Sequence, residues 1–95
     1  MIPPVYYLVL DFGRAGRETV IDWENCSKEH AILRVLRGDY GGTLVSIHCI
    51  DRDAMTWMDV TEEIAREVWD RLEDHPSPPL VEFLENSLGL VRGIA

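Results

Sequence analysis

Positive charge is scarce in this chain, and lysine is almost absent. Its 95 residues hold nine Lys and Arg against seventeen Asp and Glu, which gives a formal net charge of −8, and Lys28 is the only lysine. Direct binding to a phosphate backbone needs clustered Lys and Arg, so this balance speaks against a nucleic-acid binder and an anionic-membrane binder. The imbalance is uneven, because residues 1–50 have a net charge of −1 and residues 51–95 a net charge of −7.

Other shortages narrow the class of protein further. Two cysteines are too few for a disulfide scaffold. No apolar run approaches the roughly 20 residues of a membrane span, and the opening Met1-Ile2-Pro3-Pro4 lacks the basic and apolar regions of a secretory signal. Because 46% of the residues are apolar, we expect one folded, soluble, cytoplasmic domain over residues 1–95, with a flexible tail from about residue 89.

The apolar pattern predicts four strands and three helices. Strands are expected over residues 5–12, 17–23, 43–50 and 55–60, with a glycine-containing turn at 13–16. A first helix begins at a cap on Asn25 or Ser27 and ends at Gly38. A second begins at a cap on Asp59 or Thr61 and ends before the prolines at 76–79, and a short third covers 80–88. The order predicts an α+β two-layer fold, with a four-stranded antiparallel sheet and helices on one face.

Cysteine and histidine are the candidates for metal binding or catalysis. Cys26 and His30 are four residues apart at a helix start, and His48 and Cys49 are neighbours on a strand. Adjacent strand residues point to opposite faces, which argues against a shared zinc ion, so we expect no metal, no cofactor and no catalytic residue. The alternative is a small enzyme or ligand-binding domain with Cys26 as thiolate and His30 or His48 as base.

The second helix carries the functional hypothesis, because its outward positions are rich in carboxylates. With the preceding turn and Trp57, they give a candidate partner-binding surface of Glu62, Glu63, Glu67, Asp70, Glu73, Asp74, Asp51, Asp53 and Trp57. Some of the helix carboxylates can pair with Arg66 and Arg71 at helical spacing. A row of carboxylates suits a larger basic protein. The sequence therefore favours a non-enzymatic inhibitor of a nucleic-acid-handling protein, anti-CRISPR-like or a DNA mimic, of the kind that phages and mobile elements encode.

Three tryptophans, Trp23, Trp57 and Trp69, bear on the same question. Trp69 is expected to pack in the core from the border of the second helix's apolar face. Trp57 lies between Met55 and Met58, and this composition suits an interface, although core packing is the simpler interpretation. A homodimeric accessory subunit that pairs through an edge strand is a further alternative, and both a monomer and a homodimer fit the sequence.

Overall fold

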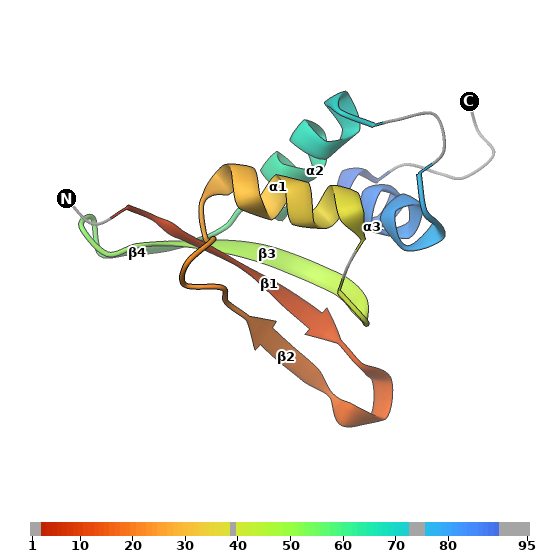
Figure 1. The fold of residues 1–95 in the computed structure, drawn as a ribbon, viewed down its shortest axis with the longest axis horizontal. Helices are drawn as coiled ribbons and strands as arrows, with labels where there is room; N and C mark the ends of the chain where they lie inside the picture. Colours follow the sequence, from red (N-terminus) through yellow and green to blue (C-terminus); the bar gives the residue numbers. More distant parts are fainter. Residues whose placement is uncertain (1–2, 39, 73–75, 90–95) are drawn as a thin grey trace.

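The chain folds into one antiparallel sheet with helices on one side (Figure 1). The computed structural model describes residues 3–38, 40–72 and 76–89. Its elements are β1 (Val5–Asp11), the short 3-10 helix η1 (Gly13–Ala15), β2 (Arg17–Val20), α1 (Lys28–Arg37), β3 (Thr43–Asp51), β4 (Thr56–Asp59), α2 (Thr61–Asp70) and α3 (Pro78–Leu88). The strand order is β2-β1-β3-β4. The predicted α+β two-layer fold is confirmed, and the tail predicted to be flexible lies almost wholly outside the described residues.

Strand alternation divides the sheet into a face that packs on the helices and an open face. Leu8 pairs with Ile47 and Leu10 with Leu44, and all four belong to the core. Val9 pairs with Ser46, so Val45 is an extra residue of β3 with no counterpart in β1. Such a β-bulge adds local twist and bends the strand.

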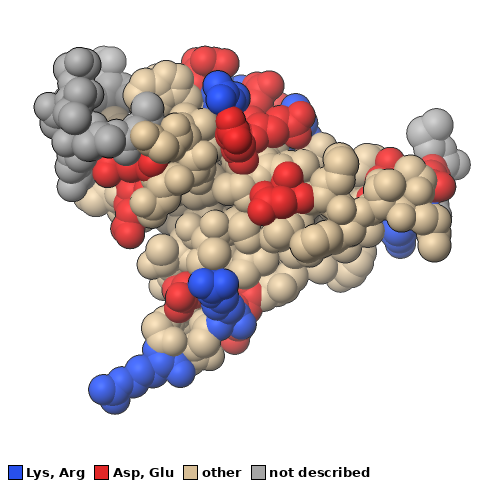
Figure 2. Space-filling model, turned by 180° about the vertical axis from the view of Figure 1, so that it is seen from behind, with Lys and Arg blue, Asp and Glu red and all other residues tan. Residues whose placement is uncertain are grey.

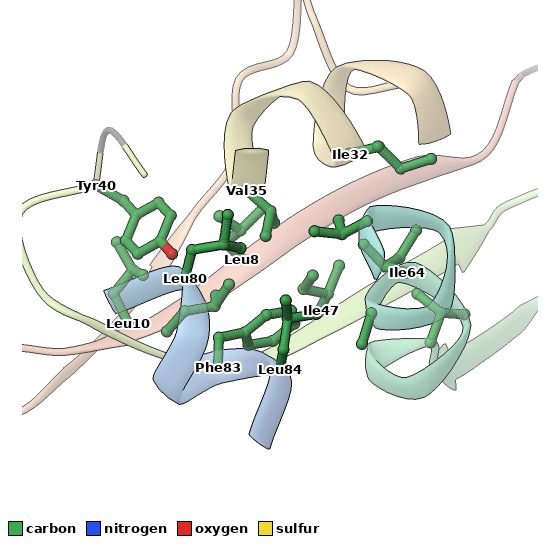
Figure 3. Packing of buried hydrophobic residues seen from close by; sticks show 14 of the residues in the cluster. Leu8, Leu10, Ile32, Val35, Tyr40, Ile47, Ile64, Leu80, Phe83 and Leu84 are labelled. Atoms are coloured by element: carbon green, nitrogen blue, oxygen red, sulfur yellow. The ribbon is translucent and has the colours of Figure 1, made fainter. Parts of the chain in front are cut away.

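The core lies between the sheet and all three helices (Figure 3). The largest fully buried side chains are Leu8, Ile32, Ile47, Ile64, Val5, Val35 and Val68. Each of the leucines and isoleucines contributes about 1.5–3 kcal/mol by leaving water. Leu80, Phe83 and Leu84 bring α3 into the same cluster, so the third helix is an integral part of the fold.

Local side-chain chemistry sets the helix boundaries. Ser27 caps α1 by accepting a hydrogen bond from the His30 N–H, and Gly38 ends it in the left-handed conformation, as predicted. The prediction that Asp59 or Thr61 is the N-cap residue of α2 is wrong, because the N-cap residue is Val60, whose side chain makes no capping hydrogen bond. The Asp59 carboxylate instead accepts a hydrogen bond at 2.9 Å from the N–H of Thr61, the first residue of α2.

Two other predictions are corrected. β2 ends at Val20, before the predicted residue 23, because the Asp22 carboxylate accepts hydrogen bonds from the N–H groups of Glu24 and Asn25 and so stabilises a turn. Trp69 was expected in the core and is 51% exposed. It lies near the end of α2, beside the buried Val68, and lines a shallow hollow with Leu88.

No helix within residues 3–38, 40–72 and 76–89 has the length and apolar character needed to cross a bilayer.

Candidate functional site

The carboxylates of α2 are interleaved with cations. Glu63 and Glu67 lie 3.6 Å and 3.9 Å from the Lys28 ammonium of α1, and Glu62 lies 2.7 Å from the Arg66 guanidinium one turn along α2. The only lysine of the chain is thus held between two of the carboxylates predicted to bind a partner. These three glutamates have structural partners and do not form an uninterrupted negative row.

Arg71 makes a second connection between the two helices. Both of its terminal nitrogens bond to the Glu29 carboxylate of α1, and it lies 4.0 Å from Glu67. This hydrogen bonding lowers the pKa of Glu29. Asp70 is exposed and has no ion pair within the described part of the chain, and the predicted positions Glu73 and Asp74 lie outside it. Glu63 and Glu67 therefore connect α2 to α1, whereas Glu62 pairs within α2.

A group of exposed apolar side chains lies on and beside β4, and Trp23, in the turn after β2, is also 63% exposed. All four residues of β4 are exposed, and Met55, just before it, is 89% exposed. Trp57 is 60% exposed and Met58 is 55% exposed. We call residues 55–59 the β4 edge. The interpretation of Trp57 as a core residue is wrong, because β4 is an edge strand of the described sheet and Trp57 lies on its open face.

The side chain of Trp57 is fixed by contacts with His48 and Tyr7. Its ring stacks on His48 with centroids 4.8 Å apart and an 11° angle between the planes, and His48 stacks in turn on Tyr7 at 5.3 Å. The Trp57 indole N–H donates to the Tyr7 hydroxyl at 2.6 Å, and the Ser46 hydroxyl lies 2.8 Å from Nε2 of His48. These residues occupy the open face of three neighbouring strands, so the sheet presents the indole in one orientation.

Acidic groups lie at both ends of the β4 edge. Asp51 ends β3 and accepts a hydrogen bond from the Ala54 N–H, and Asp53 lies in the turn between β3 and β4. Asp59 ends β4, and its pKa is lowered mainly by the hydrogen bond from the Thr61 hydroxyl. Figure 2 shows a broad area of uncharged side chains in the middle of one side of the molecule, with acidic and basic side chains around it and one acidic group within it.

The structure thus joins only part of the predicted surface. It places Trp57 with Asp51 and Asp53 on one hairpin, whereas Glu63 and Glu62 of α2 are ion-paired with Lys28 and Arg66. Sequence reasoning missed Tyr7 and His48 as the support of Trp57. Period-two alternation places each on one face of its strand, but the pairing of β1 with β3 is needed to bring them together.

The cysteines and histidines have separate local roles. Cys26 Sγ lies 3.7 Å from the Trp23 carbonyl oxygen, and His30 Nδ1 lies 2.6 Å from the Ser27 hydroxyl. His48 lies on the open face and Cys49 in the core, as the alternation predicts. Among the residues that the structure describes, no group of three or more His, Cys, Asp or Glu side chains is arranged to hold a metal ion.

Comparisons of this chain with protein-family models, with curated proteins and with solved structures found no match in any of the three.

Proposed function

We propose that this protein is a non-enzymatic binding module that docks on a basic protein through the β4 edge. The observation that carries the proposal is the exposed Trp57, fixed on His48 and Tyr7 and flanked by Met55 and Met58. Tryptophan and methionine are enriched in the centres of protein interfaces. A side chain that is already held in one rotamer loses little conformational entropy on binding.

Charge supports a basic partner. The chain carries a net charge of −8, and Asp51 and Asp59 lie at the two ends of the β4 edge. Complementary charge steers association and selects against acidic partners. A protein with a basic nucleic-acid groove has the required charge, so an inhibitor that acts as a DNA mimic is the narrower form of this proposal.

A capture experiment with matched variants tests the proposal. The immobilised full chain, the Trp57→Ala variant and the Trp69→Ala variant are incubated with nuclease-treated lysate of the source cells at low and high salt. We expect a basic protein that is retained by the wild type and by Trp69→Ala and is lost with Trp57→Ala. Loss of an interface tryptophan costs about 2 kcal/mol or more, which is roughly thirtyfold in Kd.

Trp69→Ala is the matched control because it removes an indole of similar exposure from a different element. Retention should weaken at high salt, since screening reduces the attraction between exposed charges. Equal retention by the two variants would contradict a role for the β4 edge. Retention that does not depend on salt would contradict the electrostatic part of the proposal.

A further inference from the structure

The two edges of the sheet are protected to different degrees. β2 forms one edge and carries the charged side chains of Arg17 and Glu18. β4 forms the other, and its sequence Thr-Trp-Met-Asp has no Lys, Arg or Pro. Charged side chains and proline are the usual means by which edge strands avoid pairing with another chain. The single charge of β4, on Asp59, is turned back to bond Thr61. β4 is therefore the edge open to an added strand.

The register shows which backbone groups of β4 are unpaired. The Val60 N–H donates to the Ile47 carbonyl at 2.9 Å, so residues 47 and 60 are a hydrogen-bonded pair. Bonded and non-bonded pairs alternate along an antiparallel ladder. Met58 and Cys49 are then bonded, whereas Trp57 and Asp59 are in non-bonded pairs. The N–H and C=O groups of Trp57 and Asp59 consequently point away from β3, toward the free edge.

The distance between Trp57 and Asp59 along β4 matches the repeat of hydrogen bonds between two strands. Residues two apart in a strand lie about 6.8 Å apart, the repeat at which an incoming strand presents its own donors and acceptors. The side chains suit the same arrangement, because Trp57 lies on the open face of the sheet and Met58 on the helix-facing side. An added strand would thus meet an apolar side chain on each face.

Charge selects the occupant of the edge. A second copy paired through its own β4 would bring together the Asp59 carboxylates of two chains that each carry a net charge of −8. Like charges placed across a strand pair are destabilising. An extended segment that carries Lys or Arg would instead meet these carboxylates with opposite charge.

We propose that the partner binds by adding an extended, Lys- or Arg-containing segment to β4 as a fifth strand, with backbone hydrogen bonds to Trp57 and Asp59. This inference rests on the proposed function, since it specifies how the same edge engages a basic protein. Strand addition takes its affinity from main-chain hydrogen bonds and its specificity from alternate side chains.

Amide exchange on the full-length, 15N-labelled chain tests the inference directly. The probe is a capped eight-residue peptide of alternating Lys and Val, and its control alternates Glu and Val. We expect the Lys–Val peptide to slow exchange of the Trp57 and Asp59 amides at least tenfold and to leave the Met58 amide, already bonded to β3, nearly unchanged. The Glu–Val peptide should have no effect.

Several results would overturn the inference. One is binding of the Lys–Val peptide without protection of the Trp57 and Asp59 amides, and another is no binding of that peptide. Equal protection by both peptides would remove the charge argument. At low salt, where the net charge of −8 opposes self-association, protection that rises with protein concentration in the absence of peptide would show that a second copy occupies the edge.

A pair of variants separates the backbone from the side chain. Trp57→Ala removes the indole, and Trp57→Pro removes both the indole and the edge-facing N–H. Proline is tolerated on an edge strand where its N–H would face solvent, and the melting temperature of each variant checks folding. We expect the proline variant to bind the Lys–Val peptide at least tenfold more weakly than the alanine variant. Equal affinities would overturn strand addition while leaving docking through the indole, and hence the proposed function, intact.

Discussion

Thr61 occupies the point where β3, β4 and α2 meet. Its hydroxyl oxygen accepts a hydrogen bond from the Ile47 N–H at 2.9 Å, and its hydroxyl and N–H both bond the Asp59 carboxylate. These contacts satisfy donors at the start of a helix that has no side-chain cap of its own. The carboxylate of Asp59 thus takes over part of the role that a capping residue normally has.

The Asp59 contact makes stability depend on pH. Its folded-state pKa is lowered, so the carboxylate stabilises the fold above the ordinary Asp pKa of about 3.9 and loses this effect as the pH falls through the folded value. We expect Asp59→Ala to lower the free energy of unfolding by about 1 kcal/mol at pH 7. The difference from wild type should shrink below about pH 4.

Urea unfolding followed by circular dichroism at several pH values measures this difference. Asp70→Ala is the control, because Asp70 is exposed and has no ion pair among the residues that the structure describes. A difference for Asp59→Ala that does not shrink as the pH falls below about 3.9, the ordinary Asp pKa, would contradict the assignment, because the contribution of a carboxylate with a lowered pKa declines below that value.

The boundaries of α1 could be predicted from the sequence, and the exposure of the tryptophans could not. Ser27 and Gly38 act on groups within four residues of themselves, so their chemistry is visible in a short window. Trp57 and Trp69 are as apolar as core residues. Their exposure depends on where the sheet and α2 end, which is a property of the assembled fold.

At the scale of the elements, α1 and α2 are joined by charge as well as by packing. Lys28 lies near Glu63 and Glu67, and Arg71 bonds Glu29. Exposed ion pairs contribute up to about 1 kcal/mol each and weaken with salt. The sequence indicated only the ion pairs within α2, because their spacing is visible in one helix. The ion pairs between α1 and α2 depend on how the two helices pack, which the sequence of either helix does not show.

Reversing one of these charges should separate structure from binding. Glu67→Lys would place an ammonium beside Lys28 and Arg71 and should lower the free energy of unfolding by about 1 kcal/mol at low salt, with partial recovery at high salt. Asp70→Lys is the matched reversal. It should cause little loss, because a cation near a helix C-terminus is favourable.

Thermal unfolding of both variants in low salt and in about 1 M salt tests this expectation, because charges farther apart than about 3 Å are screened at the higher concentration. Equal losses for the two variants would show that the Lys28 and Arg71 contacts do not stabilise the fold. The outcome also decides whether a charge-reversed α2 can be used in binding experiments without a change in folding.

At the scale of the whole molecule, net charge and the open sheet edge act against each other. The β4 edge favours pairing, whereas the charge of −8 opposes the approach of an identical copy. Screening length falls from about 30 Å at 0.01 M salt to about 3 Å at 1 M. We therefore expect the protein to be monomeric at low salt and to begin self-association at high salt.

Light scattering after size exclusion at the two salt concentrations measures this effect. Met58→Lys is the control variant, since an edge lysine opposes strand pairing, and it should remain monomeric at both concentrations. A dimer that is present at low salt and dissociates as salt rises would contradict the expectation. It would favour the alternative of a homodimeric accessory subunit.

The bulge at Val45 divides β3 into two parts that have different neighbours. Residues on one side of it pair with β4 and include His48, which stacks on Trp57, whereas Leu44 on the other side belongs to the core cluster. Because the bulge absorbs one residue, the register of one part does not dictate the register of the other. Sequence changes at the proposed binding edge therefore need not shift the far end of the strand, which leaves Leu44 in its place in the core.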